Sequence, residues 1–228
     1  SFDEAPFVEE NRGLLDRFER WKPAAAPARL LEACCASGWL LHHARARGWQ
    51  VRGVELSEHA VEHARRLGLE VAQGTLEDAA LPDASADLVY MGDVLEHVPD
   101  CGATMREVAR VLAPGGVFFL RGPITTHSLA RRAGLALYGA LGRDIVLHEP
   151  PYHLWEFTPR SLERLMHGAG LHVVLMEQSK ILPGRAHGRK SAAQRLVMGA
   201  LDAVNVPITR FCNAFGDRVV LVARKPAR

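Results

Sequence analysis

The sequence lacks the features of a membrane-spanning or secreted chain. No apolar run approaches the roughly 18 residues that a membrane-spanning helix needs. The opening residues 1–4 are acidic and lack the basic and apolar regions of a signal peptide. Neither the number nor the spacing of the cysteines indicates a disulfide framework or a zinc site; they are Cys34, Cys35, Cys101 and Cys212. These absences predict a cytoplasmic protein with no membrane span.

Excess charge of either sign is also absent. The formal net charge is +2, which is too small to argue for a nucleic acid or an anionic membrane as the partner. Hydrophobic residues make up 48% of the chain and charged residues 24%, as in an ordinary globular protein. A chain of 228 residues can bury a sizeable core. A nucleic acid is therefore not an expected partner.

The chain does contain a regular alternation of short apolar runs and amphipathic helical stretches. Seven runs read as strands, at residues 29–33, 50–55, 69–72, 87–91, 117–121, 171–176 and 218–223. Strands that alternate with helices favour a doubly wound, mainly parallel α/β sheet. The expected fold is therefore a seven-stranded Rossmann-like sheet.

The alternation divides the chain into four segments. Residues 1–28 form an N-terminal helical segment with an amphipathic helix over 7–21, and residues 29–122 form the alternating core. Ser57 and Thr158 are expected helix caps. Residues 123–157 break the rhythm with prolines and a small apolar patch, which predicts an inserted helical segment. Residues 158–228 return to the same sheet and include a basic, irregular loop at 180–212.

Ligands of an open α/β sheet bind at the carboxyl ends of the strands, near the switch in strand order. Four loops at those ends carry chemistry. Residues 32–38 form a small-residue turn before a helix N-terminus, and Glu55 ends the second strand. Residues 73–78 and 92–98 follow the third and fourth strands. A turn followed by such a carboxylate indicates a ligand that contains adenosine, whereas the alternative is a tight turn with a solvated acid.

These loops and their flanks resemble the S-adenosylmethionine (SAM) binding core of class I methyltransferases. Three stretches carry the likeness: Arg47-Gly48-Trp49 through Ser57, Asp93-Val94-Leu95-Glu96-His97-Val98-Pro99, and Arg110-Val111-Leu112 through Gly116. The segment from Pro150 to Pro159 resembles the region after the core in a bacterial subgroup associated with cell-surface glycan or secondary-metabolite pathways. A nicotinamide dehydrogenase is a distant alternative, because no G-x-G-x-x-G follows the first strand.

The resemblance implies a SAM-dependent methyltransferase that acts on a hydroxyl or amine of a small-molecule acceptor, such as a glycan, a lipid-linked compound or a secondary metabolite. It places SAM on residues 29–122 and makes residues 123–157 a lid over the acceptor site. Glu32 would face the methionine end, Glu55 the ribose, and Thr75, Leu76 and Glu77 the adenine. The remaining residues expected to bind the cofactor are Cys34, Ala36, Gly38, Leu56, Gly92 and Asp93.

Two departures from the family pattern lie in the glycine turn. Relatives usually carry glycine where this chain has Cys34 and Ala36. A Cβ atom makes any positive φ at these positions costly and projects toward the ligand. The alternative function is therefore a SAM-fold binding or scaffold protein that is impaired in catalysis.

A hydroxyl acceptor needs a base, and histidine suits that role near neutral pH. His97 at the rim of the site and His153 in the lid are the candidates, although either could be a capping or packing residue. His127 and His148 are weaker candidates. Asp93, Glu96 and His97 could instead be metal ligands, as in some quinone-pathway relatives, but no metal is expected. The apolar lid fits an aromatic or lipid-linked acceptor, a helical cap or a homodimer surface equally well.

Overall fold

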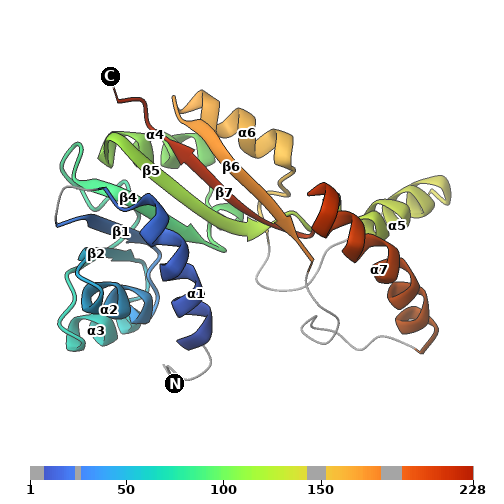
Figure 1. The fold of residues 1–228 in the computed structure, drawn as a ribbon, viewed down its shortest axis with the longest axis horizontal. Helices are drawn as coiled ribbons and strands as arrows, with labels where there is room; N and C mark the ends of the chain where they lie inside the picture. Colours follow the sequence, from blue (N-terminus) through green and yellow to red (C-terminus); the bar gives the residue numbers. More distant parts are fainter. Residues whose placement is uncertain (1–7, 24–26, 143–152, 181–191, 228) are drawn as a thin grey trace.

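The computed structural model describes residues 8–23, 27–142, 153–180 and 192–227. Its centre is one seven-stranded sheet in the order β3-β2-β1-β4-β5-β7-β6 (Figure 1). The strands span Arg29–Ala33 (β1), Gln50–Glu55 (β2), Val71–Gln73 (β3), Ala86–Gly92 (β4), Leu112–Pro123 (β5), His172–Ser179 (β6) and Arg218–Arg224 (β7). Strands β1 to β5 pair in parallel, and β7 runs antiparallel to both β5 and β6. The doubly wound, mainly parallel sheet is therefore confirmed.

Helices cover both faces of the sheet. One buried cluster joins the sheet to α1 (Val8–Phe18), α2 (Trp39–Ala46) and α3 (Glu58–Arg66). The other cluster joins it to α4 (Cys101–Val111) and α6 (Pro159–Gly168). Burial of apolar surface on both faces is the main stabilising term of such a three-layer fold.

The N-terminal helix belongs to the core. Phe18 is fully buried, and its ring lies 5.2 Å from that of Tyr90 and 5.0 Å from that of Phe119. A short 3-10 turn, Glu19–Trp21, continues α1, so the helix expected up to Trp21 changes its winding at Phe18. Aromatic edges packed on ring faces fix the position of α1 over β4 and β5.

The expected helix caps are present. The Ser57 hydroxyl accepts a hydrogen bond from the Ala60 amide (3.4 Å) at the start of α3. Thr158 caps α6 in a capping box with Ser161, and Pro159 occupies the first turn. Capping side chains satisfy amides that have no partner within the helix.

Several strand boundaries differ from those expected. The third strand is Val71–Gln73 rather than 69–72, because Leu69 packs in the core beneath α3 before pairing begins. The fifth strand begins at Leu112 and ends at Pro123, well beyond 117–121, since its pairing with β4 passes through an irregularity. The sixth strand extends to Ser179, where the edge pairing with β7 continues.

The expectation of an irregular loop at 180–212 is wrong for its second half. Residues Ala192–Cys212 form a helix of 21 residues, α7, which runs through Pro207. Inside a helix proline removes one backbone hydrogen bond and need not terminate the element. Residues 181–191 of that loop lie outside the described residues.

The inserted segment is helical, as expected, in its described part. After a 3-10 turn at Thr125–His127 comes α5, Leu129–Ala140. Figure 1 shows α5 beside α7, and the pair projects away from the sheet beyond the ends of β5 and β7. Residues 143–152 of the expected lid lie outside the described residues. They include His148 and the first three residues, 150–152, of the segment from Pro150 to Pro159. No helix among the described residues is long and apolar enough to cross a membrane.

Candidate cofactor and acceptor site

The turn between β1 and α2 is left-handed at three positions. Cys34, Ala36 and Gly38 have φ angles of 57°, 45° and 81°. A side chain at Gly38 would approach Leu69 to 2.6 Å and Ala64 to 2.9 Å, so only glycine fits between α2 and α3. The Cβ atoms of Cys34 and Ala36 therefore stand at the positive φ angles that the sequence analysis identified as costly for any residue but glycine. A non-glycine residue in this region costs roughly 1–2 kcal/mol.

Glu55 holds this turn against the second strand. One of its oxygens accepts from the Ala36 amide and the other from the Ser57 amide, both at 2.9 Å. The Cys35 amide adds a backbone hydrogen bond to Val54 (3.0 Å). A carboxylate offers about four acceptor positions, so two remain after these bonds. Glu55 is half-buried, and those positions fit the two hydroxyl hydrogens of a ribose.

Glu32 lies at the carboxyl end of β1 and is buried. Its Oε2 atom has no hydrogen-bond partner within the described chain. Burial, with a further contribution from Glu55, raises the pKa of Glu32 well above its ordinary value, whereas Arg121 lowers it. A buried carboxylate without a partner is costly. The ammonium group of a methionine moiety is the kind of ligand that would satisfy it.

The charges of three carboxylates act on the turn. Burial, together with the negative charges of Glu55, Glu32 and Glu77, raises the pKa of Cys34 to about 11. Cys34 therefore remains a thiol at neutral pH and is not a nucleophile. An acidic environment of this kind favours a cationic ligand. SAM is such a ligand, and the residues present fit it.

The loop after β3 uses its side chains internally. Three hydrogen bonds join Thr75 and Asp78. The Thr75 hydroxyl (2.7 Å) and amide (3.2 Å) donate to Asp78 Oδ2, and the Asp78 amide donates to Thr75 Oγ1 (3.1 Å). Leu76 is buried in the core, and Glu77 accepts from the Thr104 hydroxyl at 2.6 Å. Next to Glu55, Leu56 is 60% exposed. The adenine contacts assigned to Thr75, Leu76, Glu77 and Leu56 stay predictions.

The loop after β4 is arranged by two arginines that sequence reasoning missed. Asp93 has a φ of 55°, and Arg218 Nη2 lies 2.6 and 2.7 Å from its two carboxylate oxygens. Arg121 adds a contact of 3.3 Å and also pairs with Glu10 of α1. Because Arg218 begins β7 and Asp93 directly follows β4, no local sequence signal could identify this pair.

Gly92 precedes Asp93 at the end of β4. A side chain at Gly92 would come within 2.2 Å of the Tyr90 hydroxyl, so this position requires glycine. Gly92 and Asp93 lie at the expected strand end, but the Asp93 side chain is directed toward Arg218. Their contact with the methionine part of a cofactor stays a prediction.

His97 and His153, both suggested by the sequence, come together. Their ring centroids are 5.1 Å apart in an edge-to-face arrangement. The amides of Leu154 and Trp155 both donate to the Glu96 carbonyl, at 2.8 and 3.2 Å, and this fastens His153 beside His97.

Glu96 and Glu156 flank the histidine pair. Glu96 Oε1 is 3.8 Å from His97 Nε2, and Glu156 Oε1 is 3.5 Å from His153 Nδ1. Burial raises the pKa of Glu96. The ligand atoms of Glu96, His97 and His153 lie within 4.8 Å of one another. The sequence suggested Asp93, Glu96 and His97 as possible metal ligands. The structure instead groups His153 with Glu96 and His97, because Asp93 is paired with Arg218.

The weaker candidate His127 lies elsewhere. Its ring stacks on Phe215 at a centroid distance of 5.8 Å, and burial lowers its pKa. These contacts support a packing role. The other weak candidate, His148, is outside the described residues.

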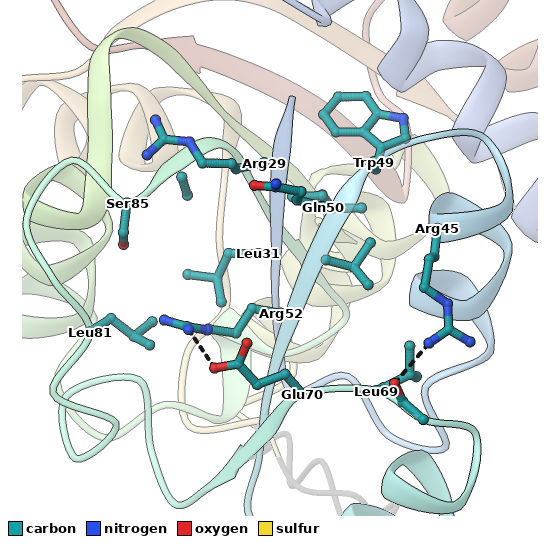
Figure 2. A pocket seen from close by; sticks show the side chains of 14 residues that line it. Arg29, Leu31, Arg45, Trp49, Gln50, Arg52, Leu69, Glu70, Leu81 and Ser85 are labelled. Carbon is teal, nitrogen blue, oxygen red and sulfur yellow. Dashed lines mark hydrogen bonds and ion pairs between the residues drawn. The ribbon is translucent and has the colours of Figure 1, made fainter. Parts of the chain in front are cut away.

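A cavity of about 570 Å³ lies at the opposite end of the sheet (Figure 2). Arg29, Gln50 and Ala86, the first residues of β1, β2 and β4, line it, which places it at the amino ends of the strands. Its charged groups pair among themselves or with neighbours: Arg52 with Glu70, and Arg29 with Asp87. Because it lies at the amino ends of the strands, away from the end where an open α/β sheet binds its ligand, the cavity is not the cofactor site.

Comparisons with known sequences agree with this geometry. A family model described as a methyltransferase domain matches residues 7–175. A probable S-adenosylmethionine-dependent methyltransferase from Mycolicibacterium smegmatis is 32% identical over 160 residues, which cover 68% of this chain and 56% of that protein. A ubiquinone biosynthesis O-methyltransferase from Xanthomonas oryzae pv. oryzae is 31% identical over 175 residues, covering 73% of this chain and 72% of that protein. The chain spans about half the length of the mycobacterial relatives.

Solved structures support the fold. A SAM-dependent methyltransferase from Archaeoglobus fulgidus superimposes with a TM-score of 0.64 at 16% identity. The match covers 95% of this chain and 94% of that one. At this identity the likeness concerns the fold alone.

Replacing Ala36 with glycine should stabilise the protein. The change relieves the left-handed strain but adds chain entropy to the unfolded state, so the free energy of unfolding should rise by about 0.5–1 kcal/mol. Ala133→Gly, in the exposed interior of α5, is the matched control and should lose about 1 kcal/mol. Urea denaturation measures both. A destabilised Ala36→Gly variant would contradict the strain at this turn.

Glu32→Gln should change how stability depends on pH. The raised pKa means that the folded state holds the Glu32 proton more tightly than the unfolded state. The stability from this group is complete below the ordinary pKa of 4.5 and declines as pH rises toward the folded pKa. The ligand-free variant should therefore exceed the wild type in stability at pH 8, with the difference shrinking toward pH 4.5.

Thermal melts over this pH range, without ligand, test the expectation. Glu163→Gln on the exposed face of α6 removes the same charge and should follow the wild type at every pH. A Glu32→Gln variant that runs parallel to the wild type would show that Glu32 is ionised in the folded protein.

Proposed function

The chain belongs to the family of SAM-dependent methyltransferases, and we propose that it transfers a methyl group to a hydroxyl or amine of a small-molecule acceptor. One observation carries the proposal: the charges of Glu32, Glu55 and Glu77 act on a left-handed turn at the carboxyl end of β1, where Glu32 Oε2 is buried without a partner. This is the switch point of the sheet, since β1 lies between β2 and β4.

In this proposal the two glutamates bind different parts of SAM. Glu55 accepts hydrogen bonds from the ribose hydroxyls, and those it accepts from the Ala36 and Ser57 amides keep the turn closed. Glu32 accepts the ammonium of the methionine end. Bound SAM supplies a methyl group that is electrophilic because it sits on a sulfonium. The protein then has to align the acceptor, exclude water and receive a proton.

The histidine pair is the proposed base. With a proton on Nδ1 facing Glu156, His153 offers Nε2 to the acceptor. His97 packs edge-on against it and lies beside Glu96. A ubiquinone biosynthesis O-methyltransferase among the relatives favours an acceptor with a hydroxyl group.

Calorimetric titration with SAM and with S-adenosylhomocysteine is the primary test. The wild type should bind both, and Glu55→Ala should lose at least about 100-fold in affinity because two hydrogen bonds to a charged group are lost. The matched control is Glu58→Ala, an exposed acid in the first turn of α3, which should bind like the wild type. Absence of wild-type binding at millimolar SAM would favour the scaffold alternative.

His153→Ala should impair turnover and spare cofactor binding. Loss of a general base typically costs 10²–10⁴ in rate, so kcat should fall at least about 100-fold while SAM affinity stays within about twofold. Radiolabelled methyl transfer to a panel of catechols, phenols and primary amines identifies the acceptor for this assay. The matched control is His172→Ala, from another edge-to-face pair, His167 and His172. Undiminished turnover in His153→Ala would remove His153 from catalysis.

A further inference from the structure

Helix α7 presents its apolar side to solvent. Ala200, Ala203, Val204, Pro207 and Phe211 recur at the spacing of one helical face, and we name them the α7 stripe. Val204 is 58% exposed and Phe211 is 83% exposed. Of the α7 side chains that the structure describes, the two buried ones are polar, Asn205 and Thr209. This arrangement is the reverse of an ordinary helix packed on a core.

The polar contacts of the covered side fix this orientation. Asn205 Nδ2 donates to the Phe215 carbonyl at 3.1 Å. Asp202 lies 3.2 Å from the Lys180 ammonium, which also contacts Asp217 at 2.6 Å. Rotating α7 to bury the stripe would break these contacts of Asn205 and Asp202. The outward apolar face is therefore part of the folded structure.

The charges around the stripe are of one sign. Among the described side chains of α5 and α7, the exposed charged ones are Arg131, Arg132 and Arg210, and the single acid, Asp202, is paired with Lys180. The net charge of +2 for the whole chain hides this local excess. Two copies docked through the stripe would bring arginines together, whereas an anionic surface would attract them.

We propose that α7, with α5 beside it, docks on the surface of an anionic lipid bilayer. The α7 stripe enters the boundary between headgroups and acyl chains, and the arginines contact lipid phosphates. Since α5 follows the carboxyl end of β5 and α7 leads into β7, the docked edge is the end of the sheet that carries the candidate site. Docking does not depend on methyl transfer, and the two can be tested separately.

Sedimentation with vesicles tests the proposal without any measurement of catalysis. The full chain should sediment with vesicles of equal parts phosphatidylcholine and phosphatidylglycerol, and not with phosphatidylcholine alone. Val204→Ser combined with Phe211→Ser should lower the partition coefficient at least about tenfold, because two apolar side chains leave the interface. Val174→Ser, at an exposed valine of β6, is the matched control and should bind like the wild type.

A second pair of variants tests the charge. Arg131→Gln with Arg210→Gln should weaken binding to the anionic vesicles several-fold, as should added salt. Arg160→Gln with Arg164→Gln, both exposed on α6, changes the net charge equally and should leave binding unchanged. The arginine variants also keep the test valid if the stripe variant does not fold.

Three results would overturn the proposal. The first is a wild type that does not bind the anionic vesicles. The second is an equal loss of vesicle binding in the α6 arginine control, which would show that the effect depends on net charge alone. The third is a wild-type dimer, seen by light scattering, that becomes a monomer in the stripe variant and binds no vesicles, because a second copy would then be the occupant.

Discussion

The candidate site depends on how Glu55 holds the turn between β1 and α2. Its carboxylate binds the Ala36 and Ser57 amides together, so that the carboxyl ends of two strands and the starts of two helices meet at one residue. The backbone of Cys34 and Ala36 then adopts a left-handed conformation that glycine would adopt at lower cost. Strain of this kind is often found at functional sites, where surrounding contacts over-determine the geometry. Here those contacts are the Glu55 bonds and the packing of Gly38 against Ala64 and Leu69.

The charges of the site fall into two groups. On the cofactor side, Glu32, Glu55 and Glu77 all act on Cys34, and burial keeps the pKa of Glu32 high. On the acceptor side, Asp93 is paired with Arg218 and Arg121, and its charge adds to the effect of burial in raising the pKa of Glu96. The site thus favours a cation at the end of β1 and leaves His97 and His153 beside the buried Glu96.

The sequence was sufficient to predict the sheet, the helix caps and the residues at the strand ends, because each depends on a local pattern. Ser57 and Thr158 cap helices through bonds to residues three positions away, and Glu55 reaches amides of adjacent loops. The predictions failed where contacts between residues far apart in the sequence determine the structure. No local pattern around Asp93 indicates that it pairs with Arg218, and none around Pro207 indicates that α7 continues through this proline. The reversed polarity of α7 was equally hidden, since only the fold determines which face is covered.

The cofactor half of the site was easier to predict than the acceptor half, and this difference follows from the chemistry. SAM brings its own electrophile, so the demands on the cofactor half are recognition and alignment, which short motifs at adjacent strand ends can satisfy. The acceptor half has to supply a base and a surface for a molecule of unspecified shape. Its parts come from distant segments: His153 reaches His97 only because the Leu154 and Trp155 amides bond to Glu96. A motif can therefore identify the cofactor, whereas the acceptor depends on how the segments after β5 fold onto the sheet.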